Sequence, residues 1–351
     1  MNRNISATLF LLISSLVFYS CSQSNKYQDV VSISYNDFPP IRKLTGKSFL
    51  QDKDILKPIH IYTYDTLLVT VNLKDKKLFN LYSLANGAER GQRISLGQGP
   101  NEMISPSIVR CASDSLLIFD AATSTVFQYN TRDFIQNGSP EPIVRKKIET
   151  HTYSELGCFP NGFVSLSISP KNQFIRFNSD GTKISEFGNY PASNINYTDI
   201  EKMTAYQASV TTNLSDKMAV CYKSTDLIEI FNWDGKLLKR VQGPEHSFAL
   251  YKEEHHGKAA MASPDKNNKD AYFSPHCVGD KLFVLFSGKV WNPDDPNSQL
   301  MNQILVFYWN GKPIERLLLD DGIVDFAVDQ KHNKIYAIIS EPEFHIMSYD
   351  L

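Results

Sequence analysis

The sequence has almost no excess charge and few glycines. Lys and Arg number 36 against 38 Asp and Glu, so the formal net charge is −2. A chain with this balance lacks the positive field that binding to nucleic acid requires. Glycine accounts for only 17 residues, and the hydrophobic fraction of 42% with a charged fraction of 21% is ordinary for a globular protein. These values exclude a disordered or fibrous chain, and the abundance of aromatic residues beside Val, Ile and Thr favours strands.

No apolar run reaches the roughly 20 residues that a membrane-spanning helix needs. The longest run follows Arg3 and extends from 5 to 19, interrupted only by Ser and Thr. This pattern indicates a secretion signal, and we expect residues 1–20 to be a signal peptide. The alternative of an ordinary signal peptide followed by an incidental cysteine stays open.

The end of this segment places a serine directly before Cys21, and a polar run follows. The arrangement resembles a bacterial lipoprotein signal. The resemblance implies cleavage before Cys21, lipidation of that residue and a membrane anchor. We therefore expect residues 21–29 to be a lipidated tether, and we expect the protein in the cell envelope at the outer membrane, with the leaflet left open.

One pattern of a turn residue, a variable residue and a short apolar strand occurs six times. Spacings between the turn residues are 49, 47, 55, 64 and 53. In each unit a second β-rich run follows and ends in an aromatic residue, and several of these runs lead into Asn-Gly or Asp-Gly, a pair typical of type I′ hairpin turns. The turn residues are Asp65, Asp114, Asn161, Asp216, Asp280 and Asn333. The aromatic residues are Tyr82, Tyr129, Phe177, Phe231, Phe307 and Tyr349.

A repeat of about 50 residues built from four strands predicts an all-β fold, a six-bladed β-propeller of four-stranded antiparallel blades. A β-sandwich is the alternative, and it would not explain six copies of one ordered pattern. The last unit ends after its third strand, so its fourth strand must come from elsewhere. We expect an N-terminal strand within 30–50, at 30–34 with a contribution from 41–45, to complete the last blade. Residues 30–351 then form a single domain.

Four cysteines remain in the predicted domain. Cys111, Cys158 and Cys277 lie three residues before the turn residue of their repeat, at equivalent places in separate blades, and Cys221 lies in a second strand. We expect free thiols that pack near the channel. Disulfide bonds remain the alternative, since the exported chain would meet an oxidising compartment.

The run Leu96-Gly97-Gln98-Gly99-Pro100-Asn101-Glu102 stands between the first and second repeats, and a partial copy occurs at 242–245. Together with the sixfold repeat and the lipoprotein start, this run resembles the TolB-like six-bladed propeller lipoproteins of Bacteroidetes. The resemblance covers essentially all of 30–351. It implies a fold and a compartment, but it supplies no catalytic residues.

Loop lengths indicate which face of the propeller carries the site. Long connections are expected at 96–106, 188–204, 242–272 and 287–302, all on one face. The loop 287–302 holds Trp291, which could stack on a sugar ring or a peptide. Its neighbours Asn292, Asp294 and Asp295 could supply hydrogen bonds or oxygen ligands for Ca²⁺. The alternative is a solvated loop whose tryptophan packs on its own blade.

Other candidate residues are less specific. His255 and His256 follow two glutamates in 242–272, but adjacent histidines do not fit one metal ion, and no third ligand is evident. His276 is expected on an innermost strand, either lining the channel or packed in the core. Glu102 belongs to a turn that joins two blades, with a position facing the channel as the functional alternative. We expect no resident cofactor, while a divalent cation such as Ca²⁺ stays open.

We therefore expect a monomeric, lipid-anchored envelope propeller that binds a glycan, a peptide or an envelope protein on its long-loop face. The sequence contains no Gly-x-Ser-x-Gly, His-Glu-x-x-His or Cys-x-x-Cys motif. Because propeller enzymes assemble their sites from distant loops, a metal-dependent hydrolase or lyase of gluconolactonase-like or polysaccharide-lyase type is the alternative. A passive scaffold within an envelope complex is the third class.

Overall fold

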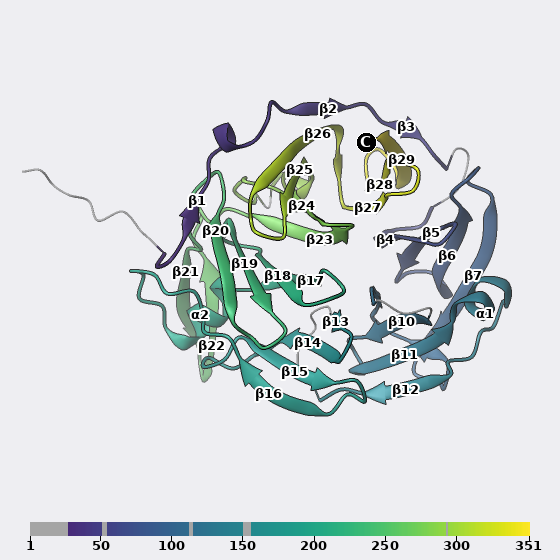
Figure 1. Cartoon of the computed structure of the whole chain (residues 1–351), viewed down its shortest axis with the longest axis horizontal. Helices are drawn as coiled ribbons and strands as arrows, with labels where there is room; N and C mark the ends of the chain where they lie inside the picture. The colour runs from purple at the N-terminus through teal and green to yellow at the C-terminus, as the bar shows by residue number, and fades with distance from the viewer. Residues whose placement is uncertain (1–26, 51–54, 112–114, 150–155, 293) are drawn as a thin grey trace, which may run out of the picture.

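The computed structural model is a ring of β-sheets arranged around a central axis (Figure 1). It describes residues 27–50, 55–111, 115–149, 156–292 and 294–351. Six sheets of four or five strands form the blades, and each runs from an inner strand near the axis to an outer strand at the rim. The predicted fold class, a closed six-bladed β-propeller, is therefore confirmed.

The first three blades follow each other along the chain. Blade one contains β4 (Pro58–Tyr64), β5 (Leu67–Asn72), β6 (Lys77–Ser83), β7 (Glu89–Leu96) and β8 (Glu102–Met103). Blade two contains β9 (Pro106–Val109), β10 (Ser115–Asp120), β11 (Thr125–Asn130) and β12 (Val144–Lys147), with helix α1 (Thr131–Gln136) between the last two strands. Blade three contains β13 (Gly157–Phe159), β14 (Gly162–Leu166), β15 (Phe174–Asn178) and β16 (Lys183–Phe187).

The last three blades each include one strand from the N-terminal segment. Blade four contains β17 (Ala208–Thr212), β18 (Lys217–Tyr222), β19 (Leu227–Asn232), β20 (Leu237–Gln242) and β1 (Val31–Ser32). Blade five contains β23 (Tyr272–Val278), β24 (Lys281–Phe286), β25 (Met301–Tyr308), β26 (Pro313–Ile323) and β2 (Arg42–Leu44). Blade six contains β27 (Asp325–Asp329), β28 (Lys334–Ile339), β29 (His345–Asp350) and β3 (Lys47–Ser48).

The repeated aromatic residue packs against an apolar residue of the neighbouring strand in every blade. All six aromatic side chains are buried. The cross-strand pairs are Leu68 with Tyr82, Leu116 with Tyr129, Phe163 with Phe177, Met218 with Phe231, Leu282 with Phe307 and Ile335 with Tyr349. Such pairs stabilise a sheet through side-chain contact on one face, so the repeat in the sequence is a repeat of core positions.

The Gly of each Asn-Gly or Asp-Gly pair has a positive φ, whereas the preceding Asn or Asp does not. The prediction of type I′ turns, which need a positive φ at both residues, is therefore wrong. In the third blade Gly181 N donates to Asn178 O (3.1 Å), and the strand register shifts after Arg176. This geometry is a type I turn followed by a glycine bulge. Such a connection is also tight, but it needs a positive φ at only one residue, the glycine.

The N-terminal segment 27–50, here called the strap, closes the ring over three blades rather than one (Figure 1). Strand β1 pairs in parallel with β20 of blade four, and β2 pairs in parallel with β26 of blade five. Only β3 pairs antiparallel with β29 and supplies the missing strand of blade six. The expectation that an N-terminal strand within 30–50 completes the last blade is confirmed by β3. Its placement at 30–34 and 41–45 is wrong, because the strands there extend the sheets of blades four and five.

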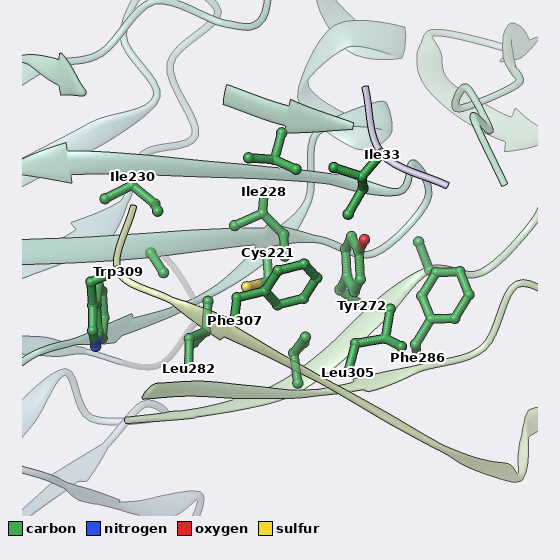
Figure 2. Packing of buried hydrophobic residues seen from close by; sticks show 14 of the residues in the cluster. Ile33, Cys221, Ile228, Ile230, Tyr272, Leu282, Phe286, Leu305, Phe307 and Trp309 are labelled. Carbon is green, nitrogen blue, oxygen red and sulfur yellow. The ribbon is translucent and has the colours of Figure 1, made fainter. Parts of the chain in front are cut away.

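The strap is fastened by its side chains as well as its backbone. Ile33 and Phe38 are buried with residues of blades four and five, and Figure 2 shows Ile33 among Ile228, Tyr272 and Phe286. A guanidinium N–H of Arg240 also donates to Gln28 O (2.6 Å). The strap is therefore part of the core of the ring.

Cys111 and Cys158 are joined by a disulfide bond, with their Cα atoms 5.3 Å apart. The expectation of free thiols is thus wrong for these two residues: equivalent inner positions in neighbouring blades bring their side chains together. Cys221 is a free thiol buried between blades four and five (Figure 2), and Cys277 is free and half-buried.

The signal segment and Cys21 lie outside the described residues. In the part of the chain that the structure describes, no helix has the length and apolar character needed to cross a membrane.

Candidate functional site

Two long connections of the described chain lie around blade five. The connection from blade four to blade five contains the hairpin β21 (Tyr251–His256) and β22 (Ala259–Pro264). The connection between β24 and β25 contains the short 3₁₀ helix η2 (Pro296–Gln299). The hairpin rests on helix α2 (Asp199–Ala205), where Glu253 N donates to Glu201 Oε1 (2.9 Å). The hairpin is therefore anchored to α2.

A cavity of about 990 Å³, here called the blade-five cavity, lies where these connections meet the inner strands. This volume is at the upper end of the range typical of small-molecule sites. Its wall comes from the base of the hairpin, the segment 265–270, the segment 290–292, the segment 299–301, Phe273 on β23 and Val324 just before β27. The cavity therefore opens on the long-loop face beside the channel.

Three aromatic rings from separate elements line the blade-five cavity. Trp291 is 45% exposed, which leaves its indole available to a ligand. Tyr251 and Phe273 are partly buried, and the Tyr251 hydroxyl is fixed by a hydrogen bond with Ser224 Oγ (3.0 Å). Aromatic rings held in this way offer flat faces for stacking at little cost in side-chain freedom.

The loop residues around Trp291 divide into lining and structural groups. Asn292 lines the cavity, and its side-chain oxygen accepts a hydrogen bond from Asp294 N (3.1 Å). Asp295 caps η2 by accepting from Asn297 N (2.9 Å). Asp294 and Asp295 are exposed and do not belong to the cavity wall. The loop thus positions Trp291 and Asn292, while its two carboxylates face solvent.

His255 and His256 lie at the far end of β21, away from the cavity wall. Each contacts a glutamate of the same strand: His255 Nε2 lies 3.2 Å from Glu253 Oε1, and His256 Nε2 lies 3.7 Å from Glu254 Oε2. Both imidazoles are largely exposed. Among the described residues no group of three His, Cys, Asp or Glu side chains is arranged to hold a metal ion.

Glu102 lies at the rim of blade one rather than at the channel. It belongs to β8, the outermost strand of the five-stranded sheet, which pairs in parallel with β7. Its carboxylate folds back over the glycine turn and accepts a hydrogen bond from Gly99 N (2.8 Å). A Cβ at Gly97 would come within 2.0 Å of this carboxylate, so a side chain there would displace it from the turn. The residue therefore stabilises the turn between two blades.

His276 lies on β23 and lines a second cavity, of about 60 Å³, between the inner strands at the ring centre. Arg110, His60 and Asp325 from blades two, one and six line the same cavity. Asp325 Oδ2 accepts from Ile61 N (3.1 Å) and lies 3.4 Å from His60 Nδ1, so it joins blade six to blade one. We call these four residues the channel cluster.

His276 and Asp325 of the channel cluster are buried, whereas His60 and Arg110 are half-buried. Burial and, to a lesser extent, the Arg110 charge lower the pKa of His276 from 6.5 to about 3, so the imidazole is neutral at pH 7. Burial also lowers the pKa of Arg110. Within the described chain, Arg110 Nη2, His276 Nε2 and Asp325 Oδ1 have no hydrogen-bond partner. Arg110 Nη2 is a donor and Asp325 Oδ1 is an acceptor, and a cavity of about 60 Å³ between such groups is large enough and polar enough to hold water.

The two cavities are lined by different residues, and the sequence predicted only some of the lining residues of each. It identified Trp291 and Asn292 for the first and His276 for the second. It missed Tyr251, Phe273 and Asp270, which line the blade-five cavity, and His60, Arg110 and Asp325 of the channel cluster. Polar residues on the innermost strand of each repeat were the available signal for the channel cluster.

The family model for TolB-like 6-blade propeller-like proteins matches residues 35–331. No curated protein matches the sequence. Among solved structures, the fold is similar to a protein of Bacteroides fragilis NCTC 9343 whose description suggests that it is exported, at 12% identity and a TM-score of 0.50, covering 87% of this chain and 94% of that one. It is also similar to a DUF4221 family member of Bacteroides vulgatus, at 9% identity and a TM-score of 0.51, covering 88% of this chain and 96% of that one.

Proposed function

We propose that this chain, which belongs to the TolB-like six-bladed propeller family, binds a small organic ligand in the blade-five cavity. The observation that carries the proposal is the exposed indole of Trp291 in the wall of a cavity of about 990 Å³. Stacking on Trp291, with hydrogen bonds from groups such as Asn292, suits a sugar or a peptide. Loops on a rigid scaffold are the usual place for such a site.

The proposal places the protein at the bacterial cell envelope, held by a lipid on Cys21. Two observations support this location: the apolar segment before Cys21 resembles a lipoprotein signal, and a structural neighbour is described as exported. Electrophoretic mobility and mass of Cys21→Ala protein test the anchor. Loss of membrane association with loss of the acyl mass supports the proposal, and unchanged membrane association contradicts it.

The binding function is tested with soluble residues 22–351 and a panel of glycans and peptides. A ligand at 100 times its dissociation constant should stabilise the fold by about 2.7 kcal/mol, a visible rise in melting temperature. A shift that Trp291→Ala abolishes supports the proposal. A panel without any shift, together with co-purification of a fixed protein partner, favours a scaffold instead.

A further inference from the structure

One carboxylate in the wall of the blade-five cavity has no counter-charge. Asp270 is half-buried, and its backbone is fixed: its N–H donates to Lys289 O (2.8 Å), and its carbonyl accepts from Gly288 N (3.0 Å). Within the described chain, its side chain forms neither a hydrogen bond nor an ion pair. Burial alone raises the pKa of Asp270, and no neighbouring cation opposes the effect.

The lysines nearest in sequence are engaged elsewhere. Lys269 Nζ lies 2.9 Å from Glu245 Oε2, and Lys289 Nζ donates to Leu300 O (3.4 Å). Lys266 lines the cavity but is exposed, and its neighbour Asp265, which accepts from Asn267, balances its formal charge. The wall of the cavity therefore keeps one unbalanced negative charge, on Asp270.

The same backbone pairing places Asp270 close to Trp291 in the cavity wall. Residue 270 lies opposite 289, and the adjacent bridge joins Lys269 to Val290, directly before Trp291. A half-buried carboxylate beside aromatic rings is a suitable environment for a cation, because the ring faces and the carboxylate both attract positive charge. A neutral ligand would leave the desolvated carboxylate without compensation.

We propose that the ligand of the blade-five cavity carries an ammonium group, which contacts the Asp270 carboxylate and the face of Trp291. This inference rests on the proposed function and names its ligand class: an amino sugar or a peptide with a lysine side chain. Neutral glycans and neutral peptides then bind more weakly than their amine-bearing counterparts.

The test uses two matched pairs of probes on soluble residues 22–351 by isothermal titration calorimetry. The pairs are glucosamine with glucose, and Nα-acetyl-lysine methylamide with Nα-acetyl-norleucine methylamide. The inference predicts that at least one amine binds ten times or more tightly than its neutral partner. Asp270→Asn should reduce this preference to less than twofold, whereas Asp294→Asn, the same change on an exposed residue of the neighbouring loop, should leave it intact.

Equal or tighter binding of the neutral partners overturns the inference and leaves the proposed function standing. An amine preference that survives in Asp270→Asn overturns it as well. Absence of binding by all four probes also overturns the inference, and the broader glycan and peptide panel then decides the proposed function on its own. A circular dichroism spectrum and melting temperature of Asp270→Asn establish that the variant is folded.

Discussion

Cys111, just after the inner strand β9 of blade two, forms a covalent bond with Cys158 on the inner strand β13 of blade three, across a sequence separation of 47 residues. The bond borders the channel, since Cys158 also lines the cavity of the channel cluster. A propeller has no single core that crosses the ring, so a bond between neighbouring blades restrains their separation directly. It also restricts the unfolded chain.

Removal of this bond should lower the stability of the ring. Replacing both cysteines with Ser should reduce the free energy of unfolding by about 2–4 kcal/mol, the usual effect of a disulfide that closes a long loop. Urea unfolding with and without dithiothreitol measures the effect. Dithiothreitol should destabilise the wild-type protein and leave the double variant unchanged; equal midpoints for reduced and oxidised wild type would contradict the prediction.

The strap should contribute to the stability of the whole ring. Phe38 is buried against Phe307 of blade five, with ring centroids 5.6 Å apart. Phe38→Ala should therefore lower the free energy of unfolding by about 3–5 kcal/mol. Val31→Ala is the control in the same segment, because Val31 is 44% exposed and its change should stay within about 0.5 kcal/mol. Similar urea midpoints for the two variants would refute a structural role of the strap.

A buried ion pair in blade four should be sensitive to removal of one partner. Arg240 donates to Glu229 Oε1 (2.6 Å), and Tyr222 donates to the other carboxylate oxygen (2.6 Å). Arg240→Met leaves a buried carboxylate without its cation and should cost about 3–5 kcal/mol. Lys183→Met, which breaks a surface pair with Glu186, should cost less than about 1 kcal/mol. If chemical denaturation showed the same loss of unfolding free energy for Arg240→Met and Lys183→Met, burial of the Arg240–Glu229 pair would not determine its contribution to stability.

The channel cluster should make stability depend on pH. His276 has a pKa of about 3 in the fold and 6.5 as its ordinary value, so the unfolded chain binds a proton that the fold resists. The buried neutral imidazole therefore contributes to the free energy of unfolding in full above pH 6.5. The contribution is lost as the pH falls towards 3, at up to about 1.4 kcal/mol per pH unit. Burial is the main cause of the low pKa of His276; the charges of Arg110 and His60 lower it as well, whereas the Asp325 carboxylate opposes them.

His276→Gln removes this titration. Its free energy of unfolding should therefore fall less steeply between pH 6.5 and 4 than that of the wild type, whatever its value at pH 7. His255→Gln changes an exposed histidine of the β21–β22 hairpin and should keep the wild-type slope. Parallel curves for His276→Gln and the wild type would contradict the burial of a neutral imidazole in the channel.

The fold was predictable because the repeat places the same residue types at the same core positions. Tyr129 and Phe177 are fully buried in equivalent strands, as their spacing from the turn residues indicated. The path of the strap was not predictable. Strands as short as Val31–Ser32 carry little pattern of their own, and which sheet edge they join depends on side chains such as Phe38 that pack between blades.

The candidate site was predictable only in its outline. Loop length indicated the face, and Trp291 indicated an aromatic surface. Asp270 gave no signal, because an aspartate in a polar loop is ordinary in a sequence; only the structure shows that its carboxylate lines the cavity without a side-chain partner among the described residues. The Cys111–Cys158 bond was missed for a similar reason: equivalent positions in a repeat reveal neighbours only when the two units are adjacent around the ring.

The central claim, that a ligand binds in the blade-five cavity, is tested most directly by ¹⁹F NMR of protein labelled with 5-fluorotryptophan. The chain has three tryptophans, and Trp291→Phe assigns the resonance of Trp291. A ligand found in the panel should shift the Trp291 resonance in proportion to saturation and leave Trp233 and buried Trp309 in place. Saturation by a ligand that leaves the Trp291 resonance unmoved would contradict the account.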